Sequence, residues 1–327
     1  MAMRTMSMPS SLGRGAGRLL RRCRMSPSLM AASRRRLMVL SIFCLHFKMG
    51  YSNVYVHPRE GLIGRAVSWL VNNRRLAALR YAVMSRIGFL KMESDVTDVV
   101  YLTWLVDAEA ARAFVAPDMR LWARNGKTLF TVLTYRHGHF GPAFLGRLRG
   151  IFPSPMQSNW RLYLDDGGSV YFLKNIMSSL PYVFGTRMFS DIMQTHLAAK
   201  FRHDGGGQRF ELDIQSGGGS SPALSCKTSA AKEKQLMPAF CSMFDSWETA
   251  VAYIACQDTA ISRAERFKRN VISEIDLPID VRQVLPLDVA DGSVNCSLLA
   301  QFPSAEGPFA FVVPRVKFRV LSERHHD

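Results

Sequence analysis

The segment from Ser158 to Asn175 constrains the fold of this chain most strongly. Two runs in which apolar and polar residues alternate flank Asp165-Asp166-Gly167-Gly168, and an Asp/Gly cluster between such runs is typical of a β-hairpin. A loop of two or of four residues gives the same register, which pairs Leu164 with Ser169, Leu162 with Tyr171, Arg161 with Phe172 and Asn159 with Lys174. The sequence therefore predicts an antiparallel pair of strands.

The two faces of this hairpin differ in character, because side chains alternate along a strand. One face carries apolar and aromatic residues: Trp160, Leu162, Leu164, Tyr171 and Leu173. The other face mixes charged, amide, aromatic and aliphatic residues: Asn159, Arg161, Tyr163, Val170, Phe172 and Lys174. This second face is too polar for a dry core and too aromatic for an ordinary solvated surface, so it predicts the wall of a ligand cavity.

The positive charge of the chain is confined to its N-terminal part. The whole sequence has 42 Lys and Arg and 26 Asp and Glu, and residues 1–92 hold 17 of the basic residues but only one acidic residue, Glu60. Residues 93–327 are therefore neutral and long enough for one β-rich domain. Aromatic residues do not interleave with the basic residues as in a stacking platform, so we expect no nucleic-acid partner.

We expect residues 1–60 to be a disordered basic extension. It fits a transit peptide or a start codon assigned too far upstream, and the apolar run Leu37–Phe47 is too short for a bilayer. The cysteines lack a C-x-x-C pair, which indicates reduced thiols in an intracellular protein. We expect a cytoplasmic location, with an organellar or a peripheral membrane location as the alternatives.

Residues 61–92 read as a basic amphipathic helical segment. Apolar residues such as Trp69, Leu76 and Val83 alternate with arginines such as Arg65, Arg74 and Arg80. Such a segment either packs on the body with its arginines in water or lies on an anionic membrane surface. Both readings stay open at this point.

Residues 93–327 are predicted to be mainly antiparallel β-structure. The predicted strands cover 96–106, 129–135, 195–202, 209–215, 270–275, 281–287, 293–301 and 309–321, besides the hairpin. Asp107 is predicted to cap a short helix over 108–115, and Asp245-Ser246-Trp247-Glu248 to open a helix whose apolar face runs from Trp247 to Ile261. Residues 138–155 and 216–234 are predicted to be loops, and 176–193 to hold only short helical pieces.

The body resembles the acetoacetate-decarboxylase-like superfamily, and most closely its large bacterial branch that is catalogued as a domain of unknown function. The resemblance covers about residues 95–287 and rests on V-V-Y-L-T-W at 99–104, N-W-R-L-Y at 159–163 and G-S-V-Y-F-L at 168–173. It implies an α+β fold: a closed antiparallel β-barrel with peripheral helices, a ligand cavity inside, and here a basic N-terminal helical arm.

The resemblance also implies a chemistry. The decarboxylases use a buried lysine that forms an imine with a β-keto acid, and Lys174 lies near the position of that lysine. In the predicted register Arg161 is diagonal to Lys174, at about 7–8 Å, where its charge would lower the pKa of the amine. Lys174 is thus the candidate catalytic residue, and Asn159, Arg161, Tyr163 and Phe172 are the candidate substrate-binding residues.

The leading hypothesis is therefore a barrel that binds a small organic acid or carbonyl compound, with a decarboxylase or other carbon–carbon lyase as its enzymatic form. The competing hypothesis is a non-catalytic module that docks on a membrane or a partner through residues 61–90. His137 and His139 could lie on one face of a strand as a metal pair, but no third ligand follows at a suitable spacing, so we expect neither a metal nor a cofactor. The oligomeric state stays open.

Overall fold

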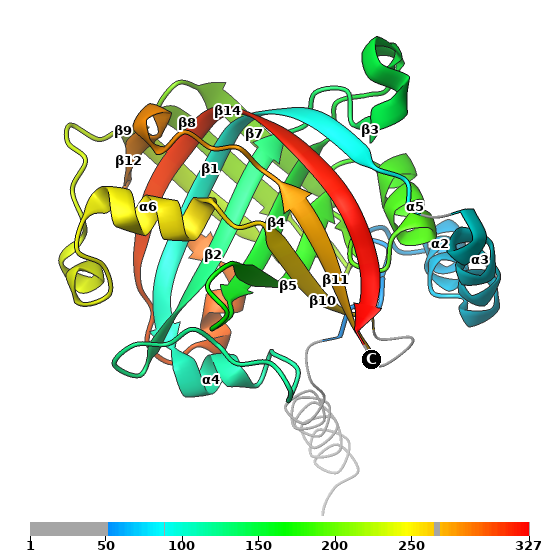
Figure 1. Ribbon diagram of the computed structural model, residues 1–327, viewed down its shortest axis with the longest axis horizontal. Coiled ribbons are helices and arrows are strands. Elements are labelled where there is room, and N and C mark those ends of the chain that lie inside the picture. The colour runs from blue at the N-terminus through cyan, green and yellow to red at the C-terminus, as the bar shows by residue number, and fades with distance from the viewer. Residues whose placement is uncertain (1–51, 88, 265–268, 327) are drawn as a thin grey trace, which may run out of the picture. The chain divides into compact units, whose positions relative to one another are not determined.

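The computed structural model describes residues 52–87, 89–264 and 269–326. Residues from Tyr51 onward form one compact unit (Figure 1). The expectations for residues 1–51, including the apolar run Leu37–Phe47, fall outside the described residues. Within the described ranges, no helix is both long and apolar enough to cross a bilayer.

Seven strands pair in a circuit that returns to its starting strand. The order is β1, β2, β4, β5, β10, β11 and β14, and β14 pairs with β1 again. All neighbours in this circuit are antiparallel except β5 and β10, which are parallel. The strands are β1 (Met92–Asp107), β2 (Lys127–Arg136), β4 (Met156–Tyr163), β5 (Ser169–Met177), β10 (Thr259–Ala264), β11 (Arg269–Asp276) and β14 (Glu306–His326).

The long strand β14 joins this circuit to a second group of strands. Near Phe311 it pairs with β1 along one edge and with β12 along the other. From β12 the sheet continues through β9 and β8 to β7. The remaining strands are β3 (Gly141–Pro142), β6 (Thr195–Leu197), β7 (Lys200–Gly206), β8 (Arg209–Gln215), β9 (Leu224–Ala230), β12 (Leu285–Val289) and β13 (Asn295–Cys296).

Both faces of the central strands are buried, because their side chains alternate between two separate hydrophobic cores. We call the first the inner core; it contains Tyr101, Tyr163 and Phe172 together with the helix α6 (Trp247–Ala255). The outer core contains Trp160, Leu162 and Leu212, the last from β8. β4 and β5 are consequently buried along nearly their whole length.

Two helices begin at side-chain caps that the sequence predicted. Asp107 accepts a hydrogen bond from the amide of Ala110 and opens α4 (Ala108–Arg112), and Ser246 accepts one from the amide of Thr249 and opens α6. The other helices are α2 (Leu62–Val71), α3 (Arg74–Ile87) and α5 (Leu180–Phe189). Short 3-10 helices lie at η1 (Ala143–Ile151), η2 (Pro238–Ser242), η3 (Val281–Gln283) and η4 (Ser297–Gln301).

Several predicted elements differ from the structure. The helix opened by Ser246 ends at Ala255, and Ile261 lies in β10 instead of on the helix face. The predicted loop over 216–234 contains β9. Its small polar residues make the alternation of buried and exposed positions hard to recognise in the sequence. α5 runs for ten residues through Gly185, so the segment 176–193 is more helical than predicted. The region around 293–301 is mainly the 3-10 helix η4.

Residues 52–58, which we call the N-terminal strap, lie against the body, although the sequence predicted a disordered extension up to residue 60. The side chain of Tyr55 is fully buried. The side-chain amide of Asn72 holds the strap to α2, since it accepts from the amide of Tyr55 at 3.0 Å and donates to its carbonyl at 2.7 Å. The strap therefore belongs to the folded unit.

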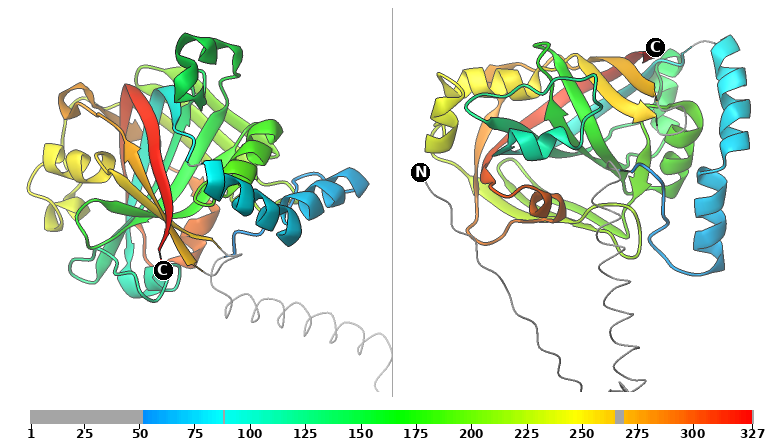
Figure 2. Two further views of the ribbon diagram at one scale, coloured as in Figure 1. Left: turned by 45° about the vertical axis from the view of Figure 1, so that its right-hand side comes forward. Right: turned by 90° about the horizontal axis from the view of Figure 1, so that it is seen from below.

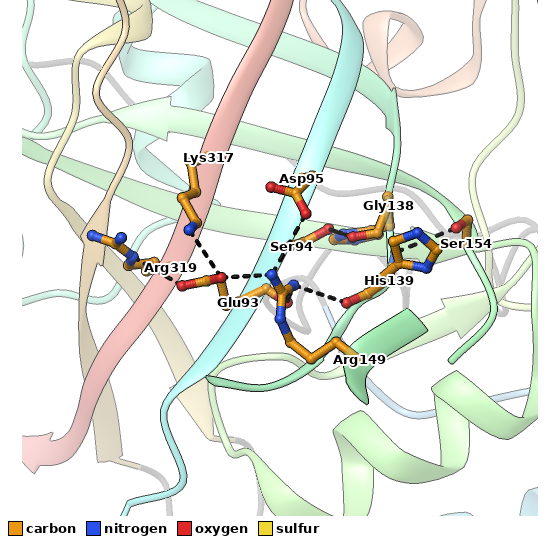
Figure 3. A network of polar contacts seen from close by, with 10 residues as sticks. Glu93, Ser94, Asp95, Gly138, His139, Arg149, Ser154, Lys317 and Arg319 are labelled. Atoms are coloured by element: carbon orange, nitrogen blue, oxygen red, sulfur yellow. Dashed lines mark hydrogen bonds and ion pairs between the residues drawn. The ribbon is translucent and has the colours of Figure 1, made fainter. Parts of the chain in front are cut away.

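A polar network braces η1 against β1 and β14 (Figure 3). The carboxylate of Glu93 accepts from Arg149 at 2.6 Å and from Arg319 at 3.1 Å, and it pairs with Lys317 at 3.1 Å. The guanidinium of Arg149 also donates to the carbonyls of Glu93 and His139. Burial acts to raise the pKa of Glu93, but the surrounding cations outweigh it and hold this pKa below its ordinary value.

Candidate functional site

A cavity of about 40 Å³ lies within the circuit of seven strands. Every strand of the circuit contributes to its lining: Val96, Val99 and Tyr101 from β1, Leu133 and Tyr135 from β2, Asn159 and Arg161 from β4, Phe172 from β5, Ala260 from β10, Ser273 and Ile275 from β11, and Val316, Phe318 and Val320 from β14. Ile192, Met193 and Leu277 complete it. The wall is thus mainly aliphatic and aromatic, with a few polar groups.

Arg161 is the charged group of this cavity, and it is almost completely buried at 2% exposure. Its Nη2 donates to the carbonyl of Ile254 at 2.7 Å, near the C-terminal end of α6, where the helix dipole favours a cation. The guanidinium carbon lies 5.6 Å from the centre of the Tyr101 ring and 5.4 Å from that of Tyr163. These rings flank the charge on its protein side.

The guanidinium of Arg161 has no acidic counterpart. Across residues 52–87, 89–264 and 269–326, it donates to the carbonyl of Ile254 and lies close to the phenol oxygens of Tyr101 and Tyr163, and no carboxylate forms an ion pair with it. Its Nε is buried without a partner in the same ranges. Burial acts to lower the pKa of Arg161, but the phenol oxygens of Tyr163 and Tyr101 outweigh it and raise this pKa. The cavity therefore holds a fixed positive charge.

Two further lining residues, Tyr101 and Asn159, carry groups that can donate hydrogen bonds. The hydroxyl of Tyr101 is buried and has no partner among the described residues. Burial raises the pKa of Tyr101 to about 12, so the phenol keeps its proton. The side-chain oxygen of Asn159 accepts from Gln157 at 2.8 Å, which fixes the amide and leaves its NH₂ group without an acceptor in the described chain.

Tyr163 supports the site from behind instead of lining it. Its hydroxyl lies 2.9 Å from the carbonyl of Ile254 and 3.1 Å from the hydroxyl of Thr131. Tyr163 and Arg161 thus converge on the same carbonyl, and the end of α6 positions both. The prediction that Asn159, Arg161 and Phe172 share one wall agrees with the structure, whereas Tyr163 holds a neighbouring position.

The predicted neighbourhood of Lys174 is wrong. The register is as predicted at Arg161 and Phe172, but β5 then contains a bulge, so that Trp160 faces Lys174 and Asn159 faces Asn175. A bulge adds one residue to one strand and exchanges the faces beyond it. Lys174 therefore lies on the Trp160 side of the sheet and does not line the cavity.

Lys174 instead lies beneath the N-terminal strap. Its ammonium donates to the carbonyl of Ser52 at 2.7 Å and lies 3.3 Å from Nε2 of His196. Nη2 of Arg187 lies 3.4 Å from the same Nε2. Burial, together with the charges of Lys174 and Arg187, holds the pKa of His196 well below its ordinary value. His196 is thus a neutral acceptor between two cations, and this cluster fastens the strap.

The two histidines considered as a metal pair do not act together. The ring of His137 is buried and hydrogen-bonded to the hydroxyl of Ser94 and the side-chain oxygen of Gln157, whereas His139 is exposed. No group of three or more His, Cys, Asp or Glu side chains suited to a metal ion occurs in the described part of the chain.

The sequence-based site lacked Tyr101 and the carbonyl of Ile254. Tyr101 lies in a run of apolar residues, where its hydroxyl carried no signal of a partner. Ile254 contributes only its main-chain carbonyl oxygen, so the type of its side chain gives no hint of this contact. Alternation within β1 places Tyr101 on the same face as Val99, and this was the one signal that could have added it.

No family model matches the chain, and no curated protein matches it. Solved structures that it is similar to include the enduracididine biosynthesis enzyme MppR complexed with pyruvate, at 12% identity and a TM-score of 0.46, over 72% of this chain and 90% of that one. An acetoacetate decarboxylase from Legionella pneumophila matches at 8% identity and a TM-score of 0.46, over 72% and 87%. An acetoacetate decarboxylase-like enzyme from Sphingomonas wittichii RW1 matches at 9% and 0.44, over 72% and 92%.

These similarities are too weak to establish a superfamily for this chain. They do not assign a ligand or a reaction to this chain, because identity and TM-score are low. The site is therefore argued from its own geometry.

Proposed function

We propose that this protein is a closed β-barrel that binds a small carboxylate or carbonyl compound in its interior. The guanidinium of Arg161 would pair with an oxygen of the ligand, and the hydroxyl of Tyr101 and the amide of Asn159 would supply further donors. The aliphatic wall would enclose an apolar ligand body. A mainly apolar pocket with a few convergent polar groups is the usual form of a small-molecule site.

One observation supports this proposal above the others: a buried guanidinium with an unpartnered Nε lines a cavity and has no acid beside it in the described part of the chain. Burying a charge is costly unless it is paired. A ligand that brings an anionic or strongly polar oxygen would supply the missing partner. Charge-assisted hydrogen bonds to a guanidinium are among the stronger polar contacts in proteins.

The experiment is a binding titration with matched pairs of ligands. Short monocarboxylates, 2-oxo acids and 3-oxo acids are each compared by calorimetry with the neutral amide of the same carbon skeleton. We expect the acids to bind more tightly by about tenfold to a hundredfold, which corresponds to a charge-assisted hydrogen bond of about 1.5–3 kcal/mol.

Variants then connect this preference to the site. We expect Arg161→Met to abolish the difference between acid and amide, and Arg161→Lys to retain part of it. Arg315→Met is the matched control, because Arg315 is an exposed arginine beside the lining residue Val316. Equal binding of acid and amide by the unaltered protein, or a preference that survives Arg161→Met, would contradict the proposal.

A further inference from the structure

The helix α2 (Leu62–Val71) presents its apolar face outward. Leu62, Ile63 and Trp69 are 79%, 80% and 67% exposed, and Leu70 and Ala66 are exposed beside them. At 3.6 residues per turn these five positions lie on one side of the helix. α2 therefore exposes the side chains that a surface helix normally buries.

The opposite face of α2 is fixed to the body, so the outward face is not a result of loose packing. Gly64 is buried, and a Cβ atom added to it would meet the carbonyl of Arg59 at 2.1 Å. The hydroxyl of Ser68 accepts from the amide of His57 at 2.9 Å. Val67 and Val71 pack on the small core around Tyr55. The orientation of α2 is thus set by close contacts along its inner side.

Positive charge predominates around this face, with the exposed Glu60 before α2 as the acidic residue nearest to it in the sequence. Residues 61–92 contain five arginines and one lysine and no acidic residue. Arg65, Arg74 and Arg75 are exposed, and Arg74 and Arg75 line a shallow surface groove together with Ser68, Trp69, Asn72 and Asn73. Figure 2 shows α2 and α3 at one side of the described unit, beside α5.

We propose that this surface docks onto an anionic lipid bilayer. An interfacial helix needs large apolar side chains on one face and cations at its margin, and Trp is favoured at the boundary between headgroups and acyl chains. Leu62, Ile63, Trp69 and Leu70 enter the interface, while Arg65, Arg74 and Arg75 contact lipid phosphates. The excess of exposed arginines beside large exposed apolar side chains is the charge and polarity pattern that an anionic lipid surface complements.

The test uses the full chain and vesicles of phosphatidylcholine, with and without phosphatidylserine. Flotation alone does not identify the surface, because residues 1–51 are also basic. The decisive measurement is the quenching of Trp69 emission by phosphatidylcholine with brominated acyl chains, taken as the difference between the unaltered protein and Trp69→Phe. We expect quenching only when phosphatidylserine is present, and less of it at high salt.

The matched variants carry two apolar-to-serine changes each. We expect Leu62→Ser with Ile63→Ser to weaken vesicle binding by at least about tenfold, since two buried side chains are lost from the interface. Phe144→Ser with Leu148→Ser in η1, where both residues are also highly exposed, should leave it unchanged.

Three results would overturn the proposal. The first is binding to vesicles without quenching of Trp69, and the second is an equal loss in the η1 variant. The third is protection of Trp69 from a soluble quencher before vesicles are added. This last result would show that another part of the chain or a second copy already covers the face.

Discussion

The rings of Tyr101 and Tyr163 flank the same guanidinium, but their hydroxyl groups differ in hydrogen bonding. The hydroxyl of Tyr163 is hydrogen-bonded to the carbonyl of Ile254 and to Thr131. That of Tyr101 is buried without a partner among the described residues. The hydroxyl of Tyr163 therefore contributes to the stability of the fold, and the hydroxyl of Tyr101 is the one that would bind a ligand in the proposed complex.

This contrast predicts different effects of two identical substitutions. We expect Tyr163→Phe to lower the free energy of unfolding by about 1–2 kcal/mol, because it removes satisfied hydrogen bonds. Tyr101→Phe should change it by less than about 0.5 kcal/mol or raise it, and should weaken carboxylate binding. Urea denaturation and calorimetry check both effects. A destabilisation by Tyr101→Phe as large as that by Tyr163→Phe would show that its hydroxyl has a structural partner.

At the scale of the element, the bulge in β5 decides which chemistry is available to Lys174. It turns the ammonium toward the strap and away from the cavity that contains Arg161. We therefore expect borohydride reduction in the presence of 2-oxo or 3-oxo acids to leave Lys174 unmodified. Peptide mapping by mass spectrometry provides the measurement. A reduced adduct on Lys174 would restore the imine hypothesis.

The network around Glu93 gives a second prediction at this scale. Glu93→Gln removes the charge that three cations share, so we expect a loss of about 2 kcal/mol in the free energy of unfolding. Faster amide hydrogen exchange should appear in η1, which Arg149 links to β1. Asp204→Asn is the control, because its ion pair with Arg202 is exposed and should contribute little. Equal losses in both variants would contradict the bracing role of Glu93.

Within these elements, the sequence predicts the strands and one wall of the cavity but not the bulge or the long-range contacts. Alternation and the Asp-Gly loop were enough to predict β4, β5, their register near the loop, and the wall formed by Asn159, Arg161 and Phe172. The bulge was not predictable, because no Gly or Pro accompanies Leu173 and the alternation continues through it. Tyr101 and Ile254 lie 60 and 93 positions from Arg161 in the sequence, and only the tertiary fold brings them together.

At the scale of the whole molecule, buried neutral histidines make the fold sensitive to acid. Burial lowers the pKa of His137 and of His203 from 6.5 to about 4. Between pH 6.5 and about pH 4, these histidines bind protons in the unfolded chain but not in the folded one. The contribution of each histidine to the free energy of unfolding is therefore fully present above pH 6.5. It is lost as the pH falls toward 4, by up to about 3 kcal/mol for each histidine.

Urea denaturation across this window tests the prediction. We expect His137→Gln and His203→Gln each to reduce the dependence of the unfolding free energy on pH. His139→Gln should preserve it, because His139 is exposed. An unchanged dependence in both buried-site variants would show that other groups cause the acid sensitivity. The lowered pKa of Glu93 acts in the same direction at still lower pH.

The buried guanidinium of Arg161 in this mainly apolar cavity has one more consequence for the proposed binding. Arginine does not lose its proton under conditions in which proteins stay folded, so the receptor side of the encounter has a constant charge. In the proposed complex, any change of affinity with pH, while the protein stays folded, must then come from titration of the ligand. Stronger organic acids should stay bound at lower pH than weaker ones, so the cavity would select among ligands by the pKa of their acid group.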